Sequence, residues 1–306
     1  MRDKSKHVTI QFPAADSWVI LNPIEQRIKE KIEKIGTPLK DWDIQINYGI
    51  KTGCNEAFII DGKKREELIA SSPNSVDIIR PILRGKDIKR YTYNFADKYL
   101  IFIPWHFPMH NDQEIKGASK EAEKEFKKQY PAIYNHLLQY KDKLANRNKA
   151  ETGIRYEWYA LQRFGANYSE DFSRPKIIYS EIVQTPQMFL DLKGKFFPEA
   201  TAFIMTGENL KYLYLLLQSS PVSYFFKTFY AGAGLGEKGI RYKKEFLQRL
   251  PIPLFLNTKK QQKILSFYDT ATDLETIQTE IDTTIYDLYS LSKDEIKFIK
   301  QKYFSQ

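Results

Sequence analysis

Residues 47–60 have the sequence Asn47-Tyr-Gly-Ile-Lys-Thr-Gly-Cys-Asn-Glu-Ala-Phe-Ile-Ile60 and combine a strand end, a glycine-containing turn and an apolar run. The strand that leads into them has apolar side chains at alternate positions, namely Ile44, Ile46 and Tyr48. Alternation of this kind predicts a half-buried β-strand. We expect the turn at residues 51–55 to join it to a second strand at residues 57–60. A β-corner is therefore predicted, with glycines that permit positive φ or a close backbone approach.

On either side of this corner, strand patterns are mixed with helix patterns. Further strands are predicted at residues 78–83, 99–103, 176–182 and 201–205, with a hairpin at residues 189–197 across Lys193-Gly194. Helices are predicted at residues 23–34, 64–70, 113–129, 131–144 and 210–230, the first of them capped by Asn22. The order predicts an α+β fold in which a mixed β-sheet carries peripheral helices.

The C-terminal part has a helical pattern of its own. Residues 250–253 read Leu-Pro-Ile-Pro, a stiff break that suggests a boundary. Between residues 264 and 288, apolar side chains recur at steps of three and four, which predicts one long amphipathic helix with a narrow apolar seam. Ser292 and Glu295 predict a capping box for a final helix. We therefore expect two units, residues 8–255 and residues 256–306.

The charge is unevenly distributed along the chain. Of 47 Lys and Arg and 38 Asp and Glu, which give a net charge of +9, seven Lys and eight acids lie beyond residue 258. The first 258 residues therefore carry 40 basic and 30 acidic side chains. A basic body with a nearly neutral tail is typical of proteins that bind polyanions, because Lys and Arg displace counterions from phosphates.

The cellular context also follows from composition. Cys54 is the single cysteine, so no intramolecular disulfide can form, which favours a reducing cytoplasm. The polar and basic N-terminus does not resemble a signal peptide. The most apolar stretch, residues 210–226, is interrupted by polar residues and a proline, so we expect core helices and no membrane association.

Common catalytic and metal-binding motifs are not found. The glycine-rich run at residues 231–239 lacks the Walker pattern and follows a predicted helix rather than a strand. His106 and His110 have helical metal-ligand spacing, but Pro108 lies between them, so we expect loop histidines. The chain has no Pro-Asp dipeptide to accompany Glu-x-Lys as in metal-dependent nucleases, and no Asn-Pro-Pro-Tyr-like motif. We therefore predict no catalytic residues and no metal ligands in this chain.

Three basic segments contain or adjoin aromatic or glycine residues: residues 80–90, 141–163 and 237–249. Each by itself is as consistent with a solvated surface as with a binding site, but three together favour nucleic acid, since Lys and Arg hold phosphates and Arg, Asn and Gln read base edges. With the polar residues of the first corner, they supply the candidate DNA-binding residues Lys51, Thr52, Asn55, Arg84, Lys86, Arg90, Arg147, Lys149, Arg155, Arg163, Lys238, Arg241, Lys243 and Lys244.

The run at residues 47–60 resembles the opening signature of the TaqI-like C-terminal specificity domain. The run Ile79-Arg-Pro-Ile-Leu-Arg-Gly-Lys-Asp-Ile-Lys-Arg-Tyr91 resembles the second signature of that family. Residues 99–102, 174–178, 250–253 and 285–295 support the resemblance in the expected order. The similarity extends over about residues 18–298, and it implies a target-recognition domain.

The resemblance also implies partners. In that family the domain follows an adenine-N6 methyltransferase domain that uses S-adenosylmethionine, and in type IIG restriction-modification enzymes an endonuclease domain, which would use Mg²⁺, precedes both. We therefore expect double-stranded DNA as the ligand, a methyltransferase or methyltransferase-nuclease as the parent bacterial enzyme, and no cofactor held by this chain. The position of the first signature near the chain start favours a fragment over a separate specificity subunit.

Two other functions stay open on sequence grounds. The apolar seam at residues 264–288 is consistent with pairing to a partner helix, as in a protein-interaction scaffold. An enzyme of unrecognised type would need a cluster of carboxylates or histidines in a concave pocket. The signature glycines and Asp87 are, likewise, as consistent with folding a β-corner as with contacting DNA.

Overall fold

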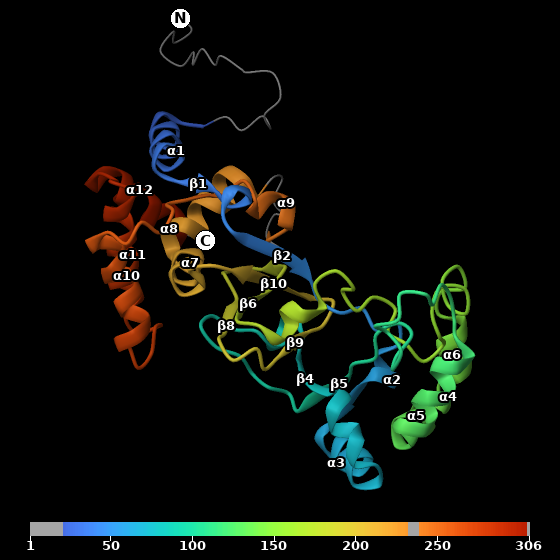
Figure 1. Cartoon of the computed structure of the whole chain (residues 1–306). Coiled ribbons are helices and arrows are strands. Elements are labelled where there is room, and N and C mark those ends of the chain that lie inside the picture. Colours follow the sequence, from blue (N-terminus) through green and yellow to red (C-terminus); the bar gives the residue numbers. More distant parts are fainter. Residues whose placement is uncertain (1–20, 232–238, 305–306) are drawn as a thin grey trace, which may run out of the picture.

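The computed structural model describes residues 21–231 and 239–304. The molecule is elongated, with two small β-sheets in the middle and helices at both ends (Figure 1). The expected α+β fold class is confirmed. Within the described ranges, the structure contains no helix with the length and apolarity needed to cross a membrane.

The central antiparallel sheet has the order β2-β10-β6-β8. Its strands are β2 Ile44–Tyr48, β6 Lys176–Ser180, β8 Met188–Asp191 and β10 Ala202–Gly207. Both faces are covered: Ile46, Ile177 and Met205 point into one apolar cluster, whereas Ile178 and Ile204 belong to another. The sheet is therefore the partition between two cores, which explains why β6 and β10 are buried at nearly every position.

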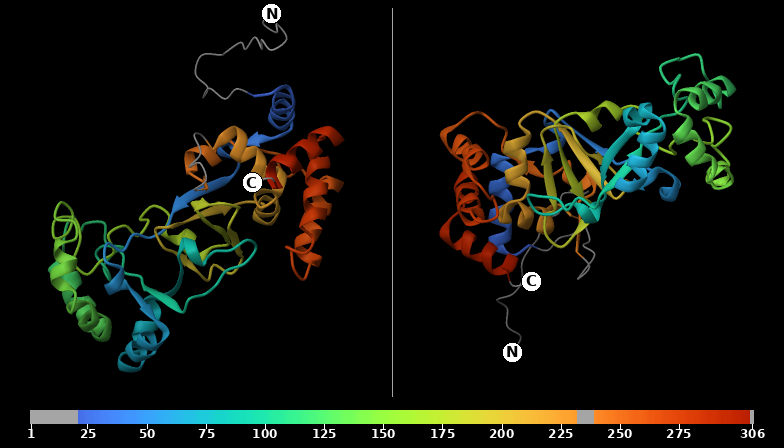
Figure 2. Two further views of the ribbon diagram at one scale, coloured as in Figure 1. Left: turned by 180° about the vertical axis from the view of Figure 1, so that it is seen from behind. Right: turned by 90° about the horizontal axis from the view of Figure 1, so that it is seen from below.

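The second sheet has the order β3-β5-β4-β9 and packs against the second core. Its strands are β3 Ile59–Asp61, β4 Ile79–Leu83, β5 Lys98–Ile101 and β9 Phe197–Pro198, with β4 and β9 parallel. The helices of this half are α2 Asn55–Phe58, α3 Gly62–Ser71, α4 Lys120–Gln129, α5 Pro131–Leu138 and α6 Lys141–Asn146. Helices α4 to α6 lie at the far end of the molecule (Figures 1 and 2).

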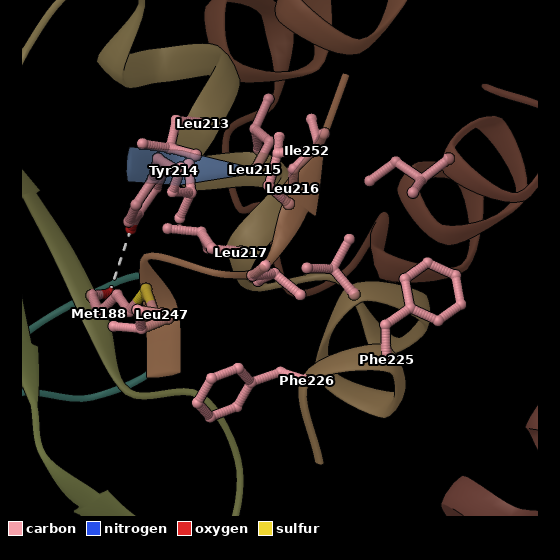
Figure 3. Packing of buried hydrophobic residues seen from close by; sticks show 14 of the residues in the cluster. Met188, Leu213, Tyr214, Leu215, Leu216, Leu217, Phe225, Phe226, Leu247 and Ile252 are labelled. Atoms are coloured by element: carbon pink, nitrogen blue, oxygen red, sulfur yellow. Dashed lines mark hydrogen bonds between the residues drawn. The ribbon is translucent and has the colours of Figure 1, made fainter. Parts of the chain in front are cut away.

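The first core is closed by helices from both ends of the described chain. They are α1 Pro23–Ile35, α7 Leu210–Leu217, α8 Ser220–Phe225, α9 Lys244–Leu247, α10 Lys259–Thr270, α11 Gln278–Leu288 and α12 Lys293–Phe304, with a π-helical turn at Phe226–Tyr230. Figure 3 shows the leucines of α7 packed among Phe225, Phe226 and Ile252, with the Tyr214 hydroxyl donating to the Met188 carbonyl at 3.4 Å.

Two short strand pairs and four 3₁₀ turns complete the described elements. Strand β1 (Thr37–Pro38) pairs with β12 (Pro251–Ile252), and β7 (Ile182–Val183) pairs with β11 (Ile240–Arg241), both antiparallel. The turns span Leu39–Asp41, Pro73–Ile78, Gly85–Asp87 and Ser169–Ser173. The pairing of β1 with β12 brings the residues after α1 against the Leu-Pro-Ile-Pro segment.

Most local predictions are confirmed by the structure. Asn22 and Glu25 form a capping box at the start of α1. Before α12, the Ser292 N–H donates to the Glu295 carboxylate at 2.7 Å and the Glu295 N–H donates to the Ser292 hydroxyl at 3.3 Å. The expected charged helix begins later than predicted, at Lys120 rather than residue 113.

The second strand of the corner is shorter than predicted. Residues 55–58 form the single helical turn α2, and the strand begins only at Ile59. The Thr52 hydroxyl accepts the Cys54 N–H at 3.1 Å and donates to the Asn55 side chain at 2.5 Å, which turns the chain into a helical bend. Ala57 and Phe58, both buried, thus belong to this helical turn and not to the strand.

The predicted hairpin at residues 189–197 is wrong. Strand β8 pairs with β6, while β9 pairs in parallel with β4. The buried Asp191 carboxylate accepts the Phe196 N–H at 2.8 Å and the Lys176 ammonium at 2.9 Å, which redirects the chain between the two sheets. Partners distant in sequence therefore override the local turn signal at Gly194.

The predicted long C-terminal helix is also wrong, because it is broken between α10 and α11. The Asp273 side chain accepts the Glu275 N–H at 2.9 Å, and the Thr276 hydroxyl donates to the Asp273 carbonyl at 2.8 Å. Such local side-chain bonds compete with helical hydrogen bonds. The seam residues Ile264, Phe267, Ile281 and Ile285 are buried in the first core, so this seam packs within the chain.

The division into residues 8–255 and 256–306 stays a prediction. Residues 8–20 lie outside the described residues. The first core contains residues from both sides of position 255. Across this position, the Tyr289 hydroxyl donates to the Pro251 carbonyl at 3.0 Å.

Candidate nucleic-acid interface

The two signature motifs meet at the turn between β9 and β10. The Gly49 N–H donates to the Ala202 carbonyl at 3.0 Å, and the Ile50 N–H donates to the Pro198 carbonyl at 2.8 Å. On the other side of the turn, the Gly85 N–H donates to the Thr201 hydroxyl at 2.9 Å. Residues 47–50 and 83–87 are thus held on opposite sides of residues 198–202, although more than 110 residues separate the turn from either motif.

This closeness explains the glycines. A Cβ atom on Gly49 would lie 2.2 Å from the Glu199 carbonyl oxygen, and one on Gly85 would lie 2.5 Å from the Thr201 carbonyl oxygen. Backbone cannot give way as a flexible side chain can, so only glycine fits at both places. These two glycines therefore have a structural role. Folding of the β-corner and contact with DNA are the two roles that the sequence leaves open for them.

Lys51 and Arg163 lie directly across from one another at this site. Their backbones exchange two hydrogen bonds of 2.9 Å each in an isolated antiparallel bridge. Both residues are exposed, and neither side chain has an ion-pair or hydrogen-bond partner among the residues that the structure describes. Two cations from different predicted segments are thereby presented side by side.

Lys86 and Arg241 lie at the adjoining end of β6. Lys86 is exposed and follows Gly85, whose Cβ position is 3.0 Å from the Ser180 hydroxyl. Arg241 pairs with Ile182 two residues further on, and its Nε lies 3.7 Å from the Glu181 carboxylate. We call the four cations Lys51, Lys86, Arg163 and Arg241 the sheet-end rim; they come from the corner and from each of the three predicted basic segments.

Arg84 is committed to an internal ion pair. Its Nε and one terminal nitrogen each donate to the Asp87 carboxylate at 2.8 Å, and the Arg84 N–H donates to the same group at 3.0 Å. Burial raises the pKa of Asp87, but the hydrogen bonds and charge of Arg84 outweigh burial, and the pKa lies below its ordinary value. This bidentate pair fixes the Gly85 turn.

Arg147 is also committed to the fold. Its guanidinium donates to the carbonyls of Thr52 at 2.9 Å, Trp158 at 3.3 Å and Ala160. It lies over the rings of Phe58 and Tyr156, and burial lowers its pKa. A DNA contact would require it to leave these partners.

Arg90 is a third cation with internal partners. It donates to the Gln218 carbonyl at 2.6 Å and lies over the ring of Tyr91. Tyr91 in turn donates its hydroxyl to Gln278 at 2.6 Å, and Gln278 donates to Asp282 at 2.6 Å. Arg90 therefore joins the second motif to the end of α7, and Tyr91 joins it to α11.

The remaining candidates are distributed over the surface. Thr52 is buried and Asn55 is exposed, and the two hydrogen-bond each other within the corner. Exposed Lys149 and Arg155 lie beyond α6, whereas partly buried Lys243 and Lys244 lie at α9, and Lys243 pairs with Glu245 at 3.4 Å. Lys238 lies outside the described residues. As DNA contacts, all fourteen residues stay predictions.

Tyr48 and Glu157 are not among the candidates predicted from the sequence. Strand alternation places Tyr48 with buried Ile44 and Ile46, yet the structure leaves it 54% exposed at the end of β2. Glu157 is buried and accepts the N–H groups of His106 at 2.7 Å and Ser119 at 2.9 Å. No local pattern indicates either role, because each depends on residues brought near by folding.

His106 and His110 behave as loop residues. His106 has φ of 62° and its ring pairs with Glu157 at 3.0 Å, while His110 stacks on Phe107. Among the residues with a described position, no three His, Cys, Asp or Glu side chains form a group that could hold a metal ion. The carboxylate beside His106 was not expected, but it orders the loop and completes no such group.

Two curated proteins similar to the chain are type II methyltransferases. The chain is 24% identical over 302 residues to the type II methyltransferase M.BstVI of Geobacillus stearothermophilus, covering 94% of this chain and 47% of that protein. It is 21% identical over 251 residues to the type II methyltransferase M.MjaIV of Methanocaldococcus jannaschii, covering 79% and 77%. The chain thus spans about half of one curated relative and about three quarters of the other.

Two solved structures share the fold. The type IIL restriction-modification enzyme MmeI, determined in complex with DNA, matches with a TM-score of 0.56 and 12% identity over 88% of this chain and 36% of MmeI. The type IIG restriction endonuclease BpuSI matches with a TM-score of 0.50 and 14% identity over 88% of this chain and 33% of BpuSI.

The family model for the TaqI-like C-terminal specificity domain matches residues 80–252. The match includes the second motif from Arg80 onward, the turn between β9 and β10, and the central sheet apart from β2. It covers more than half of the 306 residues. The chain belongs to the family of TaqI-like C-terminal specificity domains.

Proposed function

We propose that this chain is the sequence-specific duplex-DNA recognition module of a restriction-modification enzyme, and that it has no catalytic site. The observation that carries the proposal is the sheet-end rim. Four cations from four separate segments lie at one end of the central sheet, and Lys51, Lys86 and Arg163 are exposed with no ion-pair partner among the described residues. Such an arrangement suits a phosphate backbone, which fixes a protein's register on a duplex.

The parent enzyme that the family implies supplies the chemistry. We propose an adenine-N6 methyltransferase, with or without an endonuclease, acting in the bacterial cytoplasm. S-adenosylmethionine and Mg²⁺ would then belong to those catalytic domains, and among the described residues no three His, Cys, Asp or Glu side chains form a group that could hold a metal ion. Whether the chain is joined to them or is a separate subunit does not alter the role of the rim.

The interaction-scaffold alternative loses its main support. It required the apolar seam at residues 264–288 to be available to a partner helix, but Ile264, Phe267, Ile281 and Ile285 are buried within the chain's own core.

The test is selection from a random duplex pool at two salt concentrations, followed by affinity measurements on the enriched sequence. We expect one enriched motif, with binding that weakens steeply as salt rises. The variant Lys51→Ala/Lys86→Ala/Arg163→Ala should lower the slope of log affinity against log salt by about 0.9 for each phosphate that the variant no longer neutralises.

A matched variant controls for net charge. Lys259→Ala/Lys263→Ala/Lys297→Ala removes three exposed lysines from α10 and α12, which lie away from the rim. It should leave the slope close to that of the unmodified chain. Equal slopes for the two triple variants would refute the rim as the DNA contact, and absence of any binding at low salt would refute DNA recognition by this chain.

A further inference from the structure

We propose that Tyr48 is a base-stacking side chain, which places its ring against a base, or between two base pairs, of the duplex held on the sheet-end rim. The inference rests on the proposed DNA-recognition function and adds to the rim an uncharged contact that is sensitive to DNA sequence. It starts from the position of Tyr48 as the last residue of β2, the edge strand of the central sheet.

Tyr48 is exposed at a place where its strand would bury it. It shares a face of the sheet with Ile44 and Ile46, which are 9% and 3% exposed, yet 54% of its own surface is accessible. An exposed tyrosine is by itself ordinary. What distinguishes this one is the support beneath its ring and the charge beside it.

The support is a row of rings across the sheet. Tyr48 pairs in register with Phe203, and Phe203 pairs with Tyr179. The ring centroids are 4.9 Å apart in the first pair and 5.4 Å in the second. Phe203 and Tyr179 are buried, so the row is anchored at one end and open at the other. A side chain with two χ angles on such a base loses little conformational entropy when it stacks.

The charge comes from the rim. Lys51 follows Tyr48 by three residues, and Arg163 is bridged to Lys51. The two backbone hydrogen bonds between Lys51 and Arg163 hold this second cation against the segment that directly follows Tyr48. An aromatic surface beside unpaired cations is the arrangement that proteins use to stack bases while holding the backbone. This charge favours DNA over an apolar surface of a partner domain.

The inference also accounts for the rigidity of the corner. The Gly49 contact at the β9–β10 turn and the Arg147 bonds to Thr52 fix the chain on both sides of Tyr48 and Lys51. A side chain that inserts beside a base must be held in place by its surroundings, because unstacking the bases costs free energy that the new contact must offset.

The experiment compares Tyr48→Ala, Tyr48→Phe and the unmodified chain on the duplex selected above. Tyr48→Ala should bind roughly 5- to 100-fold more weakly, with an unchanged salt slope, because the substitution removes base stacking and leaves every phosphate interaction in place. Tyr48→Phe should bind nearly as well as the unmodified chain, since the ring is retained. Leu256→Ala removes a 73% exposed side chain between β12 and α10 and should have no effect.

A direct readout uses 2-aminopurine at successive positions of the same duplex. Binding of the unmodified chain and of Tyr48→Phe should change the fluorescence at one position, and binding of Tyr48→Ala should not. If Tyr48→Ala binds as tightly as the unmodified chain with the same fluorescence changes, the stacking role is wrong while DNA recognition stands.

Two other outcomes separate the proposals. Weaker association with the methyltransferase domain, with DNA binding unaltered, would make Tyr48 a protein contact and overturn the stacking role. Failure of the unmodified chain to bind any duplex overturns both proposals. Thermal unfolding of Tyr48→Ala within a few degrees of the unmodified chain excludes misfolding as the cause of weaker binding.

Discussion

Arg147 shows at the residue scale why a basic side chain in a DNA-binding protein need not touch DNA. Its guanidinium reaches the Thr52 carbonyl and two carbonyls more than 100 residues further along the chain, and two rings enclose it. Arg84 behaves similarly through Asp87. In contrast, Lys51 and Arg163 are held by their backbones alone, which leaves both side chains available.

Replacing Arg147 by Met should destabilise the chain by about 3 kcal/mol, because partly buried carbonyls lose charged donors that water cannot easily replace. Urea unfolding followed by tryptophan fluorescence measures the change. Arg155→Met is the control. The Arg155 side chain is largely exposed, and its guanidinium lies 4.0 Å from the Glu151 carboxylate, the limit of an ion pair. This substitution should alter stability by less than about 0.5 kcal/mol. Equal effects of the two substitutions would contradict the internal role of Arg147.

The lowered pKa of Asp87 predicts how the stability of the folded chain depends on pH. Its pKa in the folded state lies below the ordinary value of 3.8, so its contribution to stability is present above that value and is lost as pH falls through the folded pKa. The stability difference between the unmodified chain and Asp87→Asn should therefore be constant from pH 7 to about pH 5 and shrink below about pH 4. Urea unfolding across this range measures it; a difference that grows on acidification would contradict the assignment.

At the scale of elements, the chain leaves the central sheet after β8 beside a buried ion pair and reaches the second sheet without forming a hairpin. Lys176 on β6 has no exposed surface and donates to Asp191 on β8 at 2.9 Å and to the Phe172 carbonyl at 2.8 Å. Burial lowers the pKa of Lys176, and the charge of Asp191 partly opposes that. The pair directs the chain from β8 towards β9 and so places the turn on which the rim is built.

Single substitutions in this pair should be costly. Lys176→Met or Asp191→Leu leaves an unpaired buried group and should destabilise the chain by about 3–5 kcal/mol. The double variant Lys176→Met/Asp191→Leu should cost less than the sum of the two, although the Phe196 N–H would still lose its acceptor. Additive effects in a double-mutant cycle by urea unfolding would show that the two groups act independently.

At the scale of the whole molecule, the central sheet separates two cores and the C-terminal helices complete one of them. Ile264, Ile281, Ile285 and Tyr289 are buried against residues of α7 and α8. The neutral tail therefore supports the basic body structurally and adds little to its charge. The sheets lie between the two helical ends of the elongated molecule (Figure 2), and the rim lies at one end of the central sheet.

A chain ending at residue 255 tests the expected boundary between residues 255 and 256. Because removal of α10 to α12 uncovers the first core, we expect loss of near-ultraviolet circular dichroism and of a cooperative unfolding transition. A truncated chain that keeps both would establish residues 256–306 as a separate unit, as the sequence pattern suggests.

Local signals in the sequence were enough to predict α1, the capping box before α12, the order of most strands, the α+β class and the family. Each of these depends on interactions within a few residues or on motifs that lie intact in the chain. The broken C-terminal helix, the missing hairpin and the rim required the tertiary structure. Asp191 directs the chain away from a hairpin only because Lys176 lies beside it in the folded chain. Arg147 and Arg163 differ in role because the Arg147 guanidinium contacts buried carbonyls, whereas the Arg163 side chain is exposed to solvent. Periodicity and composition report which residues are apolar or charged, whereas the availability of a charge depends on neighbours that are far away along the chain.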